Sequence, residues 1–219
     1  MRTPFVFVLP WLIFVVPIAF VSATEIDEGF VTIFNGQNFD GWIGHTKGYA
    51  IEEGCIVCDP VSGGGSIYTE KEYANFVLRF EFKLPPGANN GLGIRTPITG
   101  NPAYDGYELQ ILDDSAKIYE NLQPYQYHGS LYGLAPAKRG FQKPLGEWNQ
   151  QEVTFDGDTV KVVLNGAEIL SANLEGIRKN PTLDGKEHPG LQRSIGHIGF
   201  LGHGAKVAIR NLRIKELPE

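Results

Sequence analysis

The sequence has few cysteines and little basic charge, and it lacks the short motifs of several enzyme classes. Two of its 219 residues are cysteines, too few ligands for a structural zinc site. Acidic residues outnumber basic ones by 25 to 19, giving a net charge of −6, so there is no electrostatic footprint for nucleic acid. No nucleophile elbow, phosphate-cradling glycine loop or H-E-x-x-H motif is present. Nucleic acid is therefore not an expected partner.

The two cysteines form a C-x-x-C pair, Cys55 and Cys58. Residues three apart in an extended strand point to opposite faces, so the pair cannot bridge if residues 49–59 form one strand. The alternatives are packing thiols or a local turn disulfide. Redox chemistry is less expected, because it favours a helix N-terminus beside the pair.

The N-terminus carries an apolar run, residues 5–21, that ends in the small residues Ser22 and Ala23. This pattern predicts a secretory signal peptide over residues 1–23 and a single mature domain over residues 24–219. We therefore expect export to the periplasm or the extracellular space, with no membrane association after cleavage. A retained N-terminal anchor helix is the alternative, since the run is close to spanning length.

Long amphipathic helical periods are missing from the mature chain, and short apolar runs separated by turn residues take their place. The predicted fold is all-β, a two-sheet antiparallel sandwich or jelly roll. Asp156-Gly157-Asp158 and Asn165-Gly166 predict hairpin turns, and one helical turn is expected near residues 117–120. The candidate strands are residues 30–34, 49–59, 66–69, 76–84, 90–96, 107–112, 130–133, 148–156, 159–164, 167–173, 197–202 and 206–215.

Residues 76–114 hold the densest set of reactive side chains, and we interpret them as three adjacent antiparallel strands. Alternation places Glu108 and Gln110 on one strand face, and Arg95 on one face with Gly91 and Gly93. A carboxylate, an amide and a guanidinium would then meet on one sheet surface. Burial raises a carboxyl pKa and a neighbouring arginine lowers it, as in many acid and base sites. A structural Glu108–Arg95 ion pair is the alternative.

Two histidines and a pair of acids are further candidates. His203 lies between two glycines at a predicted strand end, and its ordinary pKa suits proton transfer near neutrality. His128 is a second candidate. Asp113 and Asp114 could bind a divalent cation or cap a turn. Aromatic side chains that could stack on a sugar are Trp42, Trp148, Tyr104, Tyr107 and Tyr132.

Several motifs follow one another across residues 30–219. They are Phe34-Asn35-Gly36 with Gly41-Trp42, Asn89-Asn90-Gly91 with Arg95, Gly106-Tyr107-Glu108-Leu109-Gln110-Ile111-Leu112-Asp113-Asp114, Leu131-Tyr132-Gly133, Lys143-Pro144, Gly146-Glu147-Trp148-Asn149, Leu164-Asn165-Gly166, His203-Gly204 and Arg210-Asn211-Leu212-Arg213-Ile214. Their order and spacing resemble the 3-keto-disaccharide hydrolase family. This family usually has Gln where this chain has Leu201 and Ser where it has Asn90.

The resemblance implies a concanavalin A-like jelly roll that cleaves a glycoside oxidised at C3 of one sugar. The implied route is proton abstraction at C2, elimination of the C1 oxygen and addition of water. In this hypothesis Glu108 or His203 transfers protons and Arg95 binds the enolate, a role that a divalent cation could replace. No cofactor is otherwise expected. The expected substrate contacts are Asn90, Gln110, Tyr107, Tyr132, Lys143, Trp148 and Asn149.

Two other function classes remain open at the level of the sequence. The same jelly roll serves carbohydrate-binding modules that lack activity. An ordinary retaining glucanase would carry a second carboxylate close to the first on one strand face, where this chain has Gln110. A carbohydrate is the expected ligand in every case.

Overall fold

The computed structural model describes residues 28–218, and within them the chain is almost entirely β. The helical segments are short: α1 Pro102–Asp105, α2 Leu174–Arg178, and the 3-10 turns η1 Thr46–Gly48, η2 Lys117–Tyr119, η3 Pro124–Gln126 and η4 Pro189–Gln192. The strands are β1 Val31–Thr32, β2 Trp42–Gly44, β3 Tyr49–Glu52, β4 Cys55–Cys58, β5 Gly65–Tyr73, β6 Phe76–Lys83, β7 Asn89–Thr96, β8 Tyr107–Leu112, β9 Trp148–Asp156, β10 Thr159–Leu164, β11 Ala167–Asn173, β12 Gly196–Gly202 and β13 Ala208–Glu216.

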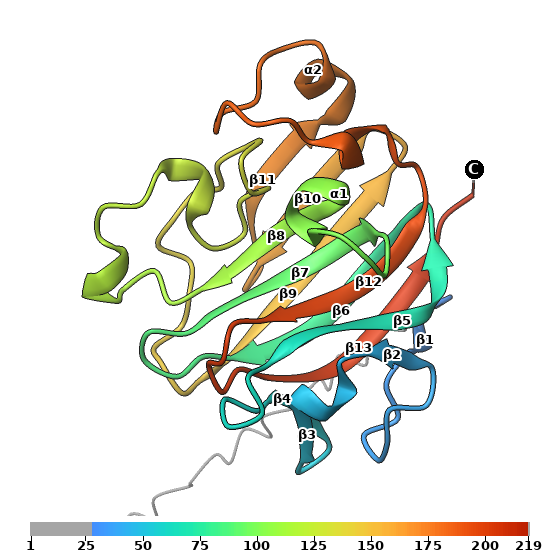
Figure 1. The fold of residues 1–219 in the computed structure, drawn as a ribbon, viewed down its shortest axis with the longest axis vertical. Helices are drawn as coiled ribbons and strands as arrows, with labels where there is room; N and C mark the ends of the chain where they lie inside the picture. Colours follow the sequence, from blue (N-terminus) through green and yellow to red (C-terminus); the bar gives the residue numbers. More distant parts are fainter. Residues whose placement is uncertain (1–27, 219) are drawn as a thin grey trace, which may run out of the picture.

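The strands form two antiparallel sheets stacked face to face (Figure 1). The larger sheet has the order β11-β10-β9-β6-β13-β4-β3, and β1 pairs with β13. The smaller sheet has the order β2-β5-β12-β7-β8. The predicted all-β, jelly-roll sandwich is therefore confirmed.

The core lies between the sheets and follows from side-chain alternation. In β6, Leu78, Phe80 and Phe82 are at most 2% exposed, while the residues between them are half-buried. Phe200 of β12 packs edge-on against Phe80 at 5.9 Å between ring centroids. Burial of such aromatic side chains is the main stabilising contribution in a sandwich of this kind.

Two predicted strand arrangements are wrong. Residues 76–84 do not lie beside residues 90–96, because β6 pairs with β9 and β13 in the larger sheet. The rigid segment Leu84-Pro85-Pro86-Gly87 carries the chain across to the other sheet. Residues 49–59 form two strands rather than one, since Glu53 and Gly54 both adopt positive φ and turn the chain between β3 and β4.

Several other local predictions are confirmed. The two hairpins join β9, β10 and β11 into a meander, and η2 is the expected helical turn. Cys55 and Cys58 lie three apart within β4 and are free thiols. Strand β2 and helices α1 and α2 were not predicted. Residues 130–133 form no strand and contribute two isolated bridges, from Leu131 to Leu109 and to Ala135.

The predicted signal peptide, residues 1–23, lies outside the described residues. Within residues 28–218, the helices are too short or too polar to cross a bilayer.

Candidate functional site

The outer face of the smaller sheet carries Glu108, and we call it the Glu108 face. The register of β7 and β8 places Gly93 opposite Glu108 and Gly91 opposite Gln110. Strand β12 continues the row, with Gly199 opposite Gly93. Glycines on two neighbouring strands leave room above the sheet, and the side chains of adjacent strands fill it.

The Glu108 carboxyl group lies across the backbone of β7. A Cβ atom at Gly91 would overlap Glu108 Oε1, so only glycine leaves room for this rotamer. The residue is 7% exposed, and burial raises the pKa of the carboxyl group to about 7. Within residues 28–218 no hydrogen bond or ion pair reaches this carboxyl. An unpaired buried carboxyl that titrates near neutrality is typical of a general acid or base.

Gln110 and Tyr132 lie beside Glu108. Gln110 Nε2 donates to Asn89 Oδ1 at 2.8 Å, which fixes the amide on this face. The Tyr132 amide donates to the Glu108 carbonyl at 2.9 Å, and this contact adds residues 129–133 to the free edge of β8. The backbone of Tyr132 is therefore next to that of Glu108, and Gln110 lies on the same face of β8 as Glu108.

His203 follows β12, two residues after Leu201. The Leu201 side chain lies 3.3 Å from a Cβ position built on Gly93, which places it on the Glu108 face. His203 is the first residue beyond the end of β12. His203 is exposed, but nearby protein atoms displace part of the solvent around its imidazole, and this lowers the pKa of the side chain. Within residues 28–218 no hydrogen bond joins His203 to Glu108, so its role stays a prediction.

Arg95 does not share the Glu108 face, and the predicted cluster with Glu108 is wrong. Arg95 has a φ of +50°, which breaks the alternation of β7. Its guanidinium donates to the Ala74 carbonyl at 2.8 and 3.0 Å and lies 5.3 Å from the centroid of the Phe155 ring, at one end of the core. Burial lowers the pKa of this guanidinium, with Tyr107 and Asp158 opposing the effect.

Asn90 and Tyr107 also lie on the inner side of the sheet, away from Glu108. Asn90 is opposite Ile111 and fully buried, and its Oδ1 accepts from the Gly91 amide at 2.8 Å. The Tyr107 hydroxyl donates to the Leu191 carbonyl at 3.0 Å. The predicted substrate contacts of these two residues are therefore wrong for a ligand at Glu108.

Three more predicted contacts belong to other surfaces. Trp148 lies on the outer face of the larger sheet, where the guanidinium of Arg210 is 3.9 Å from its ring centroid. Asn149 accepts from the Lys143 amide at 2.8 Å and so anchors a loop.

Lys143 lines a 610 Å³ cavity at the sheet edge, and a second cavity of 560 Å³ lies beside Arg95. Neither cavity is lined by Glu108.

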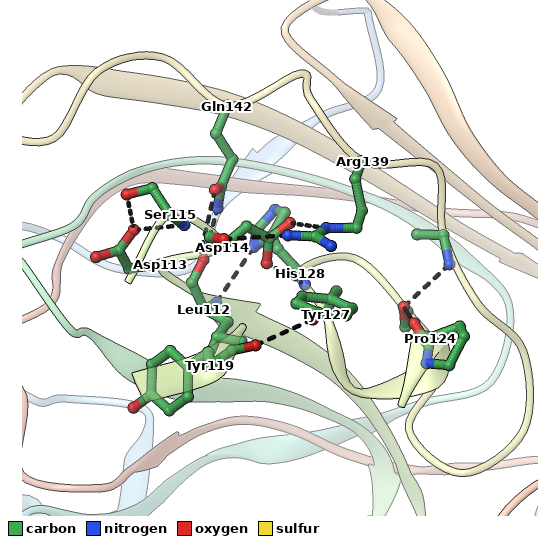
Figure 2. Close-up of polar contacts among 12 residues, drawn as sticks. Leu112, Asp113, Asp114, Ser115, Tyr119, Pro124, Tyr127, His128, Arg139 and Gln142 are labelled. Carbon is green, nitrogen blue, oxygen red and sulfur yellow. Dashed lines mark hydrogen bonds and ion pairs between the residues drawn. The ribbon is translucent and has the colours of Figure 1, made fainter. Parts of the chain in front are cut away.

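Asp113 and Asp114 are held in a polar network at the end of β8 (Figure 2). Asp113 accepts from the Ser115 hydroxyl at 2.6 Å and the Gly87 amide at 2.8 Å. Asp114 accepts from the His128 amide at 2.9 Å and lies 3.7 Å from Arg139. Both carboxylates have the contacts of turn caps. Within residues 28–218, no three His, Cys, Asp or Glu side chains gather as a metal site would require.

His128 is part of the core rather than of a site. Its ring lies 5.0 Å from that of Phe82, its Nε2 is 3.0 Å from Gln151 Oε1, and its Nδ1 accepts from the Leu112 amide. Both ring nitrogens are satisfied by the neutral tautomer with the proton on Nε2. Burial accordingly lowers the pKa of His128 to about 4.

Comparison with known proteins identifies the family. The model of the 3-keto-alpha-glucoside-1,2-lyase-like domain matches residues 29–215. The chain belongs to this family. A 3-keto-disaccharide hydrolase from Bacteroides thetaiotaomicron is 27% identical, over 87% of this chain and 79% of the relative.

Solved structures of other proteins share the fold of this member of the 3-keto-alpha-glucoside-1,2-lyase-like family. A candidate glycosyl hydrolase from Parabacteroides distasonis has a TM-score of 0.76 and 28% identity, covering 90% of this chain and 98% of its own. A second from the same organism has a TM-score of 0.75 and 27% identity, covering 86% and 99%. A Bacillus subtilis protein with a galectin-like fold, 12% identical with a TM-score of 0.55, shares the fold over 85% and 94% of the two chains.

One group of polar side chains close to Tyr132 is not predicted from the sequence as a group. It consists of Tyr104, Asp184, Lys186 and His188, and of these the sequence predicts only Tyr104 as a possible ligand contact. The group depends on a long-range contact between α1 and residues 183–188. Local patterns carry no signal for such a pairing.

Proposed function

We propose that this chain cleaves 3-keto-glycosides, with Glu108 as the base that removes the C2 proton. The observation that carries the proposal is the unpaired carboxyl group on the Glu108 face, whose pKa is raised to about 7. Family membership and the hydrolase relative support the substrate class. A module that only binds sugar has no need of a buried carboxyl without a partner, which costs stability.

The proposed reaction begins with a ketone at C3, which acidifies the C2 hydrogen. The Glu108 carboxylate takes that proton, the electron pair forms an enolate with the ketone, and the C1–O bond then breaks as a C1–C2 double bond forms. Water adds to C1 afterwards, and C2 regains a proton. Since the Arg95 guanidinium is bonded to the Ala74 carbonyl, we assign the Gln110 amide and the Tyr132 hydroxyl as donors to the substrate oxygens.

An ordinary retaining glucanase fits this geometry less well. That mechanism needs a second carboxyl group about 5 Å from the first. The next acidic residue in the sequence after Glu108 is Asp113, just beyond the end of β8. Its carboxylate accepts hydrogen bonds from Gly87 and Ser115 and caps a turn.

Turnover of a 3-keto-disaccharide by the purified protein, with the unoxidised disaccharide as control, tests the proposal. Glu108→Gln should lower kcat/KM by about 1,000-fold or more, because it removes the base and keeps the shape. Glu120→Gln, at an exposed glutamate, should leave turnover unchanged. A primary isotope effect with C2-deuterated substrate is expected. Full turnover by Glu108→Gln combined with His203→Ala would reject the assignment.

Two further points belong to this proposal. Parallel assays with and without a chelator show whether a divalent cation takes part. From residues 1–23 we also propose export, and the N-terminal sequence of the protein recovered outside the cytoplasm would reveal cleavage after Ala23.

A further inference from the structure

Residues 183–188 are built onto the segment that borders Glu108. The amides of Leu183 and Asp184 donate to the Gly133 carbonyl at 2.8 and 3.3 Å. Gly133 has a φ of +73°, and a Cβ atom there would lie 2.7 Å from Asp184 Oδ2. The preceding residue, Tyr132, is the one whose amide bonds to the Glu108 carbonyl. The loop is therefore held beside the catalytic candidate by close packing.

A buried histidine forms the base of this loop. The side chain of His188 is fully buried, and its Nε2 lies 3.2 Å from each carboxylate oxygen of Asp184. Its Nδ1 has no hydrogen-bond partner among the described residues, which costs free energy. The ring of Tyr104 rests edge-on against the imidazole, with 4.8 Å between centroids. The His188–Asp184 pair thus fixes where the Tyr104 phenol stands.

An ammonium group meets that phenol. Lys186 Nζ lies 2.9 Å from the Tyr104 hydroxyl, and the same ammonium interacts electrostatically with Tyr132. The backbone of Lys186 is fixed on both sides, by Asp184 Oδ1 at 3.1 Å from its amide and by the Thr182 hydroxyl at 2.7 Å from its carbonyl. Lys186 is exposed, but it projects from a loop that is held in place.

We propose that Tyr104 is the general acid for the leaving sugar, and that Lys186 stabilises the phenolate formed. The inference rests on the proposed function of Glu108. As the C1–O bond breaks, the Tyr104 hydroxyl gives its proton to the departing oxygen, and the negative charge passes to the phenolate beside the ammonium. When water adds, its hydroxyl group bonds to C1 and Glu108 gives the proton that it took back to C2. The proton that the water loses returns to the Tyr104 phenolate through solvent.

The chemistry requires such a group. A sugar alkoxide is a poor leaving group unless a proton reaches it, and Glu108 is occupied as the base. A positioned acid contributes about 100-fold to 10,000-fold in rate. The Lys186 ammonium, 2.9 Å from the Tyr104 hydroxyl, places a positive charge beside the phenolate that this proton transfer would form.

The test compares two leaving groups in Tyr104→Phe, which keeps the ring on His188. A 3-keto-disaccharide needs a proton at its departing oxygen, whereas a 3-keto 4-nitrophenyl glucoside does not. We expect kcat to fall about 100-fold or more on the disaccharide and less than about 5-fold on the nitrophenyl substrate. Lys186→Met should show the same selectivity with a loss of about 10-fold. Tyr119→Phe and Lys179→Met are the matched controls.

The outcomes separate this inference from the proposed function. Equal losses on both substrates would assign Tyr104 a structural role, and an unchanged disaccharide rate would remove it from the reaction. In both cases an inactive Glu108→Gln variant leaves the function of Glu108 standing. Normal turnover by Glu108→Gln would instead overturn the proposed function, whatever Tyr104→Phe does.

Discussion

At the scale of single residues, the proposed reaction and the stability of the fold favour different protonation states of Glu108. The residue is 7% exposed and has no charged partner among the described residues, and burial raises the pKa of its carboxyl group to about 7. The proposed base must be ionised to act. Ionising this carboxyl inside the fold is what costs stability.

The two effects have opposite pH dependence. The rate, kcat/KM, should rise with pH up to about 7, as Glu108 ionises. Stability should fall as pH rises from 4.5 towards 7, because the folded-state pKa is above the unfolded value and the folded chain holds the extra proton. The loss is roughly 3 kcal/mol at most. Urea unfolding at pH 5 and pH 8 should therefore show Glu108→Gln gaining stability relative to the wild type as pH increases. A constant difference would contradict this account.

At the scale of elements, strand β7 decides which side chains reach the Glu108 face. Gly91 and Gly93 have no side chains and so leave space on that face. Arg95 has a positive φ, and its guanidinium therefore lies at the end of the core. The Leu201 side chain of β12 packs over Gly93. The strand thus supports the site through backbone shape, without a reactive group of its own.

Gly91→Ala tests the role of that shape. The added methyl group would overlap Glu108 Oε1, so the carboxyl has to leave its rotamer. We expect kcat/KM to fall by about 100-fold, as for a misplaced catalytic group. Gly176→Ala in α2 is the control, since its Cβ would meet only Asn173 Oδ1, at 3.6 Å. Activity of Gly91→Ala close to that of the wild type would show that Glu108 does not need this position.

At the scale of the whole molecule, His128 joins the two sheets at their polar end. It sits against Phe82 of the larger sheet and bonds to Leu112 of the smaller one. The backbone amide of His128 donates to the Asp114 carboxylate, which also lies beside Arg139 (Figure 2). Gln142 joins the same network by donating to the Leu112 carbonyl. Protonation of this imidazole inside the fold would place a second ring proton against the Leu112 amide.

Acid should therefore destabilise the sandwich through His128. Its folded-state pKa of about 4 is below the unfolded value of 6.5, so the unfolded chain binds the proton first and stability falls as pH drops from 6.5 to 4. The loss is about 3 kcal/mol. His128→Gln should flatten the pH dependence of the urea midpoint in that range.

The sequence by itself determined the fold class, most strand limits and the strand face on which Glu108 lies, because alternation and turn chemistry are local properties of the chain. It also placed Gln110 beside the carboxyl correctly. The tertiary structure decided that β6 lies in the opposite sheet, that Arg95 leaves the Glu108 face and that Tyr104 meets Lys186. Each of these depends on a backbone conformation or a contact between distant segments, and neither has a period that a sequence can show.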